Sequence, residues 1–405
     1  MLSLRFIVYA PQVLFAQHSH ELLTTQGLLK QKYSCSFIRS NKFSSWQYFS
    51  SGCRKEDQQK YGSLFIMNHL KEVPYLSRSA LTLPAWFFVI NIAFSSFLIT
   101  QIVLLSSNNE YKAYGTLPDF NFAAAGDWGC RDSADTINNI VNKNPELVIG
   151  LGDNSYEDTP NCWFEKIAPL DDKMKITIGN HDDETTLLLN QYMSHFNLTK
   201  QFYSFNYQNV HFTVISTELI SNDSEGIEQY EFVNTDLASA ASDPNIDWIV
   251  VYHHREAYTS PYTTSANEER VRTALITLRD AYHPLFEKYD VDLVLQAHNH
   301  NYERSYPIRY NNANSSAPIV TDTHTNNYSN PEGQIFVTVG TGGRGSYNFL
   351  SKEPYMVHQY TGYGFLNVDV IDNGQKFNAT FYSNYGDIKD QFSITKNAST
   401  SADTK

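Results

Sequence analysis

The sequence predicts an α/β fold in which two mixed β-sheets are flanked by helices, with one transmembrane helix before them. Three observations carry this prediction. Short apolar runs alternate with helical stretches after residue 118, residues 83–105 are apolar throughout, and polar side chains follow the ends of several short runs. Alternating strands and helices are typical of layered α/β domains, and a long uncharged run is typical of a membrane span.

The composition is that of a folded, acidic protein. Its 405 residues are 41% hydrophobic and 18% charged, which is enough apolar material for one large core. Residues 1–107 contain ten Lys and Arg against four Asp and Glu, so the net charge of −13 comes from the remainder of the chain. An acidic surface repels the phosphate backbone of nucleic acids, so we expect no nucleic-acid partner.

The run at residues 83–105 has no ionisable side chain and is long enough to cross a bilayer as one helix. The alternative is a buried core helix, but the run lacks a polar stripe. Lys71 and Arg78 precede it and Glu110 follows it, which by the positive-inside rule places the N-terminus in the cytoplasm. We expect a membrane-anchored protein whose C-terminal domain is extracytoplasmic at the cell surface, or a secreted one if the chain is cleaved near residues 106–107.

Residues 1–66 mix Ser, Gln and aromatic residues without a sustained period. Met67 opens a plausible shorter signal-anchor that leads into the apolar run. We therefore interpret residues 1–82 as a cytoplasmic or non-physiological segment, with Met67 as the alternative start of translation.

Two further features agree with an extracytoplasmic domain. N-glycosylation sequons occur only after the apolar run, at Asn197, Asn222, Asn314, Asn327, Asn378 and Asn397. Cys130 and Cys162 are the only cysteines in this part of the chain. A disulfide between them is the prediction for an oxidising compartment, and two free thiols are the alternative.

The domain is expected at residues 118–390, after a linker at 108–117 and before a polar tail at 391–405. We expect strands at residues 121–125, 147–151, 175–178, 248–252 and 293–296, and helices at residues 135–144, 228–241 and 268–287. Residues 202–207 and 210–216 form a predicted hairpin. Three later strands, at residues 335–339, 364–370 and 377–383, are expected to close a second sheet.

Side chains able to bind metals come just past the ends of predicted strands, at Asp127, Asp153, Asn180, His254 and His298. Ligands gather at this edge of the sheet in α/β folds. Carboxylate, amide and imidazole groups suit hard and borderline cations, and a pair of cations needs one bridging carboxylate, for which Asp153 is the natural choice. Each residue alone is more often a cap or a loop hydrogen-bond partner, but the ordered set predicts a metal site.

These residues lie in five short blocks: GDWG at residues 126–129, GDNSY at 152–156, GNHD at 179–182, VYHH at 251–254 and AHNH at 297–300. The ordered set resembles the purple acid phosphatases, within the calcineurin-like metallophosphoesterases. The resemblance also includes residues 302–305, 337–343 and 362–364. It implies a four-layer metallophosphoesterase sandwich in its compact, single-domain form.

The resemblance further implies a dinuclear centre. Asp127, Tyr156 and His300 are expected to hold Fe(III), and Asn180, His254 and His298 to hold a divalent Fe, Zn or Mn ion, with Asp153 shared. Tyr156 distinguishes this family from most other metallophosphoesterases, because a phenolate prefers Fe(III). Without that tyrosine, a phosphodiesterase with two divalent ions would be the better interpretation.

Substrate contacts are expected from Asn180, His181 and Tyr258. The resemblance places His181 where it contacts phosphate and protonates the leaving group. The family's further histidines after the fourth block have no counterpart at residues 255–262, so His253 is a second catalytic candidate, although it is equally a candidate for packing.

Weaker candidates surround this set. Trp128, Tyr258 and Tyr262 are candidates for the pocket wall, and Arg344 for substrate binding. One departure from the family is Ala297 in place of glycine, which is tolerated unless the backbone there needs a positive φ.

The expected function is acid phosphatase activity, which releases alcohol and inorganic phosphate from small phosphorylated substrates. A phosphodiesterase or nucleotide hydrolase with the same metals is the first alternative. A metal-binding surface protein without turnover is the second, although no predicted ligand is missing.

Overall fold

The computed structural model describes residues 5–8, 14–20, 33–39, 46–49, 117–220, 223–263 and 268–396, without the side chains of 268–275. The chain divides into two compact units, Met1–Tyr111 and Lys112–Lys405. The predicted transmembrane run at residues 83–105, the signal-anchor start at Met67 and most of the linker lie outside the described residues. In the part of the chain that is described, no helix has the length and apolar character to cross a membrane.

The first unit contains four short strands, β1 (Arg5–Val8), β2 (Leu14–His20), β3 (Tyr33–Arg39) and β4 (Trp46–Phe49). They pair in chain order as an antiparallel sheet. The sequence pattern did not predict these strands, because residues 1–66 mix Ser, Gln and aromatic residues without a sustained period.

The second unit contains two seven-stranded sheets and a small two-stranded one, β13 (Ile308–Arg309) with β14 (Ile319–Val320). The first large sheet has the order β15 (Asn327–Ser329), β20 (Ile388–Thr395), β19 (Lys376–Ser383), β18 (Gly364–Ile371), β5 (Phe120–Ala125), β6 (Leu147–Gly150), β7 (Met174–Ile176). The second has the order β17 (Met356–Tyr360), β12 (Tyr302–Ser305), β16 (Ile335–Val339), β11 (Leu293–Gln296), β10 (Trp248–Tyr252), β9 (Val210–Val214), β8 (Tyr203–Tyr207).

Five helices accompany these sheets in the described residues: α3 (Ala134–Lys143), α4 (Asn161–Ile167), α5 (Thr186–His195), α6 (Ser224–Ser242) and α7 (Glu268–Lys288). Both large sheets are mixed. In the first, β5, β6 and β7 pair in parallel, whereas β18 pairs with β5 antiparallel. In the second, β9, β10, β11 and β16 pair in parallel, whereas β12 pairs with β16 antiparallel. The predicted α/β fold with two mixed sheets is confirmed.

One expectation about the sheets is wrong. Residues 335–339 were expected to share a sheet with residues 364–370 and 377–383, but β16 lies beside β11 whereas β18 and β19 lie beside β5. All three runs are apolar, and an apolar run does not show which neighbour it will pair with. The domain also continues past the predicted boundary at residue 390, because β20 runs to Thr395 and buries Phe392 and Ile394.

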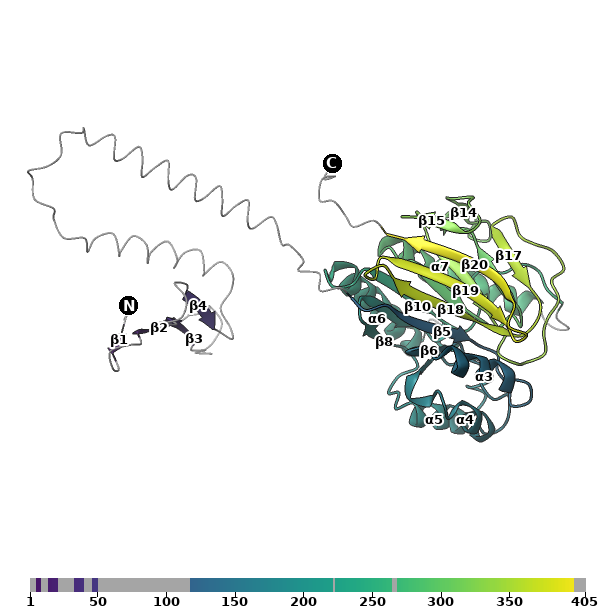
Figure 1. The fold of residues 1–405 in the computed structure, drawn as a ribbon, viewed down its shortest axis with the longest axis horizontal. Helices are drawn as coiled ribbons and strands as arrows, with labels where there is room; N and C mark the ends of the chain where they lie inside the picture. The colour runs from purple at the N-terminus through teal and green to yellow at the C-terminus, as the bar shows by residue number, and fades with distance from the viewer. Residues whose placement is uncertain are drawn as a thin grey trace, which may run out of the picture. The chain divides into compact units, whose positions relative to one another are not determined.

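The alternation of side chains along β10 shows how the layers pack. Trp248, Val250 and Tyr252 belong to the core between the two large sheets. The intervening Ile249 and Val251 belong to a second core with residues of α6 and α7, which cover the outer face of this sheet. Figure 1 shows β5, β18, β19 and β20 side by side, with α3, α4 and α5 near β5 and β6.

The two large sheets meet at the ends of their parallel strands. The Gly126 amide, just after β5, donates to the carbonyl oxygen of Val339 at the end of β16, over 2.9 Å. His254, just after β10, reaches the Leu151 carbonyl oxygen after β6, with a distance of 2.8 Å from its Nδ1. The loops after β5, β6, β10 and β11 therefore converge at one place.

Candidate metal centre

The predicted ligands sit on loops with unusual backbone conformations. Asp127, Asp153, Tyr156 and His298 have φ angles of 56°, 52°, 59° and 66°. Residues other than glycine rarely adopt this left-handed region, and they cluster at functional sites when they do. The sharp turns after the strands bring these side chains towards one another.

One group of ligand atoms consists of Asp127, Tyr156 and His300. The Tyr156 hydroxyl donates to Asp127 Oδ1 over 2.8 Å and lies 2.9 Å from His300 Nε2. His300 Nε2 is 3.3 Å from Asp127 Oδ1. These three atoms are the donors that the sequence predicts for Fe(III), and the structure brings them together.

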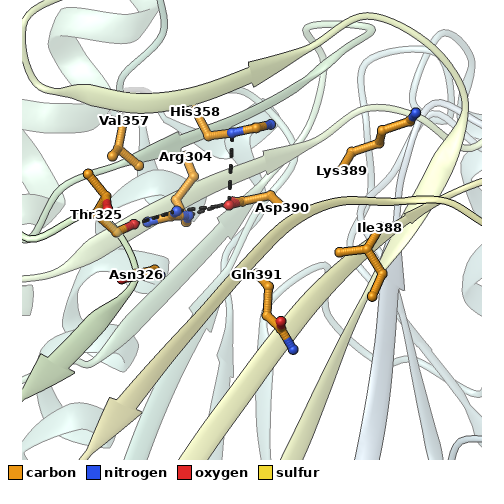
Figure 2. Close-up of a pocket in the computed structure, with 9 residues that line it drawn as sticks. All are labelled: Arg304, Thr325, Asn326, Val357, His358, Ile388, Lys389, Asp390 and Gln391. Atoms are coloured by element: carbon orange, nitrogen blue, oxygen red, sulfur yellow. Dashed lines mark hydrogen bonds and ion pairs between the residues drawn. The ribbon is translucent and has the colours of Figure 1, made fainter.

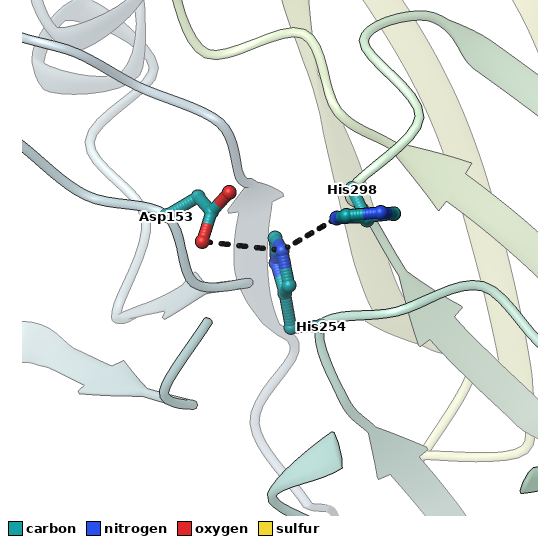
Figure 3. A group of neighbouring side chains, drawn as sticks. All are labelled: Asp153, His254 and His298. Carbon is teal, nitrogen blue, oxygen red and sulfur yellow. Dashed lines mark hydrogen bonds and ion pairs between the residues drawn. The ribbon is translucent and has the colours of Figure 1, made fainter. Parts of the chain in front are cut away.

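A second group consists of Asp153, His254 and His298, which point towards one another in Figure 3. Asp153 Oδ1 lies 3.2 Å from His254 Nε2, and His254 Nε2 lies 3.2 Å from His298 Nδ1. One ligand atom from each of the three residues lies within 4.8 Å of the other two, so together they could hold a cation.

Asn180 supplies a test of whether a cation fits here. Its Oδ1 is buried and has no hydrogen-bond partner among the described residues. A buried amide oxygen without a partner costs free energy, and a cation would satisfy it. The donor set of carboxylate, phenol, amide and imidazole also suits borderline metals, so the residues present fit the implied group.

Backbone carbonyl groups orient two of the histidines. His300 Nδ1 lies 2.8 Å from the Gly345 carbonyl oxygen, and His254 Nδ1 lies 2.8 Å from that of Leu151. Each contact places the ring proton on Nδ1 in the neutral form, which leaves Nε2 with its lone pair towards the ligand group.

Asp182 connects the two loops that carry Asp153 and Asn180. It is fully buried, and its carboxylate accepts hydrogen bonds of 2.9 Å from the backbone amides of Asp153, Asn154 and Gly179. Burial, aided by the charge of Asp153, raises the pKa of Asp182 to about 7. Asp182 belongs to the GNHD block, but its local sequence did not predict this connecting role.

The charges of the site are paired in the absence of a cation. Burial alone would lower the pKa of His254, but the Asp153 and Asp127 carboxylates raise it to about 10. Burial alone would raise the pKa of Asp127, but His300 holds it below its usual value. Burial and the Asp127 carboxylate raise the pKa of Tyr156 well above 10. A cation binding here must therefore displace protons.

His181 lies at the edge of the site with 40% of its side chain exposed. Its Nδ1 is 2.5 Å from Glu184 Oε1, and its ring centroid is 4.5 Å from that of Tyr156. This contact engages Nδ1 and leaves Nε2 without a hydrogen-bond partner among the described residues, and the role of His181 stays a prediction.

Aromatic and cationic side chains surround His300 and Tyr156. Tyr347 stacks on His300 at 4.1 Å between ring centroids, and Tyr262 stacks on Tyr347 at 5.6 Å. The exposed Arg344 places its guanidinium carbon 4.5 Å from the Tyr156 ring centroid. The candidates Tyr262 and Arg344 thus lie near the site. Tyr347 was not predicted, because nothing in its local sequence distinguishes it from the many other tyrosines.

Two candidates are not brought to the site. Tyr258 is fully buried in the core beneath α7, with its hydroxyl 2.7 Å from His283 Nδ1, so its position does not support contact with a substrate. Trp128 is buried against Trp163 and forms part of the core rather than a pocket wall. A loop residue beside a site can point into the core, and local sequence does not show which way it turns.

His253 is fully buried, and its Nδ1 lies 2.8 Å from the Arg255 carbonyl oxygen. Burial lowers the pKa of His253 to about 4, so this ring is a neutral imidazole rather than an acidic imidazolium at mildly acidic pH. Its surroundings therefore favour the packing alternative over the catalytic one.

Two further predictions concern the loops themselves. Cys130 and Cys162 form a disulfide, which links the loop after β5 to α4. Ala297 is absent from the residues with positive φ, so its methyl group meets no backbone strain, and the left-handed residue is the following His298.

A cavity of about 310 Å³ lies elsewhere in the domain, and none of the predicted metal ligands lines it. Figure 2 shows Arg304 and Asp390 paired at this cavity, with His358 beside them. Four of the five N–H donors of Arg304 are occupied, by Asp390, the Tyr328 hydroxyl and the Thr325 carbonyl oxygen. This cavity is accordingly a structural feature of the sheet edges.

Comparisons with known proteins identify the family to which this domain is similar. Residues 120–302 match the calcineurin-like phosphoesterase family. Probable inactive purple acid phosphatase 1 of Arabidopsis thaliana is 31% identical over 203 residues, which cover 49% of this chain and 31% of that protein. Acid phosphatase type 7 of Danio rerio is 27% identical over 243 residues, covering 54% of this chain and 52% of that protein.

Among solved structures, a purple acid phosphatase from yellow lupin (Lupinus luteus) seeds has a TM-score of 0.58 at 22% identity. The match covers 69% of this chain and 54% of the lupin chain, and it shows similarity of fold. This chain spans about a third of the Arabidopsis relative and about half of the zebrafish one. The chain therefore contains a calcineurin-like phosphoesterase domain over residues 120–302, and its relatives include proteins named purple acid phosphatases, the family that its motifs resemble.

Proposed function

We propose that this protein hydrolyses phosphomonoesters to an alcohol and inorganic phosphate, at a dinuclear centre of Fe(III) and a divalent Fe, Zn or Mn ion. One observation carries the proposal: six of the seven predicted ligands form two groups of three, Asp153 acts on a member of each group, and the seventh, Asn180, has a buried Oδ1 without a partner among the described residues. The charge of Asp153 acts on His254 and also on Tyr156, which supports its role as the bridge.

The assignment of ligands follows the two groups. Asp127, Tyr156 and His300 would hold Fe(III), and Asn180, His254 and His298 would hold the divalent ion. When bound, such a pair supplies a hydroxide nucleophile at mild or acidic pH and neutralises charge on the phosphoryl oxygens.

The chain's own residues bind and orient the ester. His181, whose Nδ1 is held by Glu184, donates from Nε2 to a phosphoryl oxygen or to the leaving alkoxide. Arg344 presents an exposed cation beside Tyr156, where it attracts an anionic substrate to an otherwise acidic protein. Tyr347 and Tyr262 shield one side of His300 from water.

Two alternatives differ in their observable consequences. A phosphodiesterase or nucleotide hydrolase would use the same ligands but prefer a different ester. The alternative of a metal-binding protein without turnover is supported by one relative, because the Arabidopsis protein described above is named as probably inactive. This chain, however, keeps all seven predicted ligands and His181.

We further propose that the run at residues 83–105 anchors the protein in a membrane with the catalytic domain extracytoplasmic, or that cleavage after it releases a secreted form. The disulfide between Cys130 and Cys162 supports an oxidising compartment. Asn197, Asn314 and Asn327 are exposed on the domain, as glycosylated residues must be.

Metal analysis and a visible spectrum of the purified, oxidised protein test the centre. We expect iron together with a second metal, and a purple absorption band that disappears in Tyr156→Phe. Hydrolysis of p-nitrophenyl phosphate, its bis ester and ATP then separates the functions. Faster hydrolysis of the bis ester or of ATP would favour a phosphodiesterase or a nucleotide hydrolase over the proposed phosphomonoesterase. A purified protein without metal would contradict the proposed dinuclear centre.

A further inference from the structure

Arg255 directly follows the metal-ligand candidate His254, and its guanidinium is held in one orientation. Its Nε donates to Glu218 Oε1 over 2.9 Å, and its Nη2 donates to Glu218 Oε2 over 3.1 Å. This two-point contact leaves Nη1 without a carboxylate partner in the described part of the chain. Nη1 lies 3.4 Å from His298 Nε2.

The contact between Arg255 and His298 is unfavourable once the site is loaded. His298 Nδ1 faces the ligand group, 3.2 Å from His254 Nε2, so this nitrogen is the one that would hold a cation. A neutral imidazole with its Nδ1 bound carries its proton on Nε2. Nη1–H and Nε2–H are then both donors and cannot bond to each other.

Two adjacent donors are satisfied by one shared acceptor. Glu218 does not contact Nη1, because its two oxygens accept from Nε and Nη2 on the opposite edge of the guanidinium. Arg255 is 21% exposed in its side chain, so a ligand from solution can reach it. A negatively charged oxygen beside the divalent ligands fits both donors, since charge-assisted hydrogen bonds are the strong ones.

We propose that Arg255 Nη1 and His298 Nε2 together bind a terminal oxygen of the substrate's phosphoryl group, and that Arg255 thereby selects monoesters over diesters. The inference rests on the proposed function and names its specificity determinant. A monoester phosphoryl group has three non-bridging oxygens and up to two negative charges, whereas a diester has two such oxygens and one charge. The additional cationic donor therefore stabilises a bound monoester more than a bound diester.

A purely structural role for Arg255, as an anchor for the short helix that carries Glu218, predicts a different result. Loss of an anchor would disturb the loop of His254 and slow both reactions equally. The ratio of monoesterase to diesterase activity, rather than either rate alone, therefore distinguishes the two roles.

The test compares the full-length, metal-loaded protein with Arg255→Gln, Arg255→Lys and the control Arg309→Gln. Arg309 is 52% exposed and pairs with Glu287 at the surface, so its variant loses the same charge away from the site. We expect Arg255→Gln to lower kcat/KM for p-nitrophenyl phosphate by about 10- to 100-fold, the effect of losing one hydrogen bond to a charged group. Hydrolysis of bis(p-nitrophenyl) phosphate should change far less.

Binding of inorganic phosphate, measured by calorimetry, provides a readout that does not depend on turnover. Its affinity should fall in Arg255→Gln by a factor similar to that for the monoester and stay unchanged in Arg309→Gln. Arg255→Lys keeps a charge but loses the two-point contact with Glu218, so it should fall between the wild type and Arg255→Gln. This variant gives the answer if Arg255→Gln does not fold.

The outcomes separate the two levels of the proposal. If the metal-loaded wild type hydrolyses neither ester, the proposed function fails. If the wild type is active but both substrates lose the same factor in the Arg255 variants, or phosphate affinity stays at the wild-type value with full metal content, the role of Arg255 is overturned.

Discussion

His181 shows how one residue can be positioned for catalysis without being buried. Its ring is held between Glu184 and the face of Tyr156, while its Nε2 stays accessible. Four of the seven metal-ligand candidates, in contrast, are buried, and backbone carbonyl groups orient two of these four, His254 and His300. In the proposed function, this is the difference between residues that hold a cation and one that contacts the substrate.

Replacing His181 with alanine should therefore lower kcat by about 10²- to 10⁴-fold, the usual contribution of a positioned proton donor. Metal content should stay at the wild-type level, because His181 is outside both ligand groups. Steady-state kinetics and metal analysis of the same preparation measure the two effects. Leu187→Ala, at a neighbouring residue that is 70% exposed, is the control. Wild-type turnover in the His181 variant would remove this residue from the mechanism.

At the scale of elements, a buried ion pair connects the two large sheets. Arg304 on β12 and Asp390 on β20 are 1% and 8% exposed, and they make two hydrogen bonds to each other. Arg304 also bonds Tyr328 on β15, and the Tyr302 hydroxyl donates to Asp390. Removal of one partner would leave the other charge buried without compensation.

Arg304→Met should thus lower the free energy of unfolding by about 3–5 kcal/mol, the range for breaking one side of a buried ion pair. Denaturant unfolding of the wild type and variant gives the difference. Lys389→Met is a matched control, since Lys389 lines the same cavity but pairs with Asp387 at the surface, and it should have little effect. Equal effects of the two substitutions would contradict the role of the buried pair.

At the scale of the whole molecule, the carboxylates and histidines of the site carry opposite charges that stabilise each other. A bound cation would displace the protons that these histidines carry. The pKa of His254 is raised to about 10 by its carboxylate neighbours, although burial opposes the shift. A raised pKa in the folded state contributes stability that is fully present below the ordinary value of about 6.5. That contribution is lost as the pH rises through about 10.

We therefore expect the metal-free protein to lose stability between about pH 6.5 and pH 10, because of the raised pKa of His254. The metal-loaded protein should show no such loss, since a bound cation replaces the proton. Metal binding at pH 7 should also release protons, which calorimetry in buffers of different ionisation enthalpy detects. A metal-free protein whose stability rises over this range would contradict the paired-charge description.

The sequence alone supported much of the site because each ligand candidate follows a strand. The apolar runs at residues 121–125 and 147–151 predicted where these two strands end, and Asp127 and Asp153 lie just beyond them. The positions of Tyr347 and Glu218 could not be predicted, since Tyr347 lies on a loop and Glu218 on a short 3-10 helix, Thr217–Leu219, without a distinctive local pattern.

The sequence by itself determined which residue types are available as metal ligands and their order along the chain. Metals select their ligands by the chemistry of the ligand atoms, and the residue type alone sets that chemistry. Only the tertiary structure decided which neighbours of those ligands face the site. Tyr258 turns into the core and Arg255 turns towards His298, although both lie a few residues from His254. The physical reason is that a loop side chain points where packing and hydrogen-bond partners from distant segments allow, and those partners meet only in the folded protein.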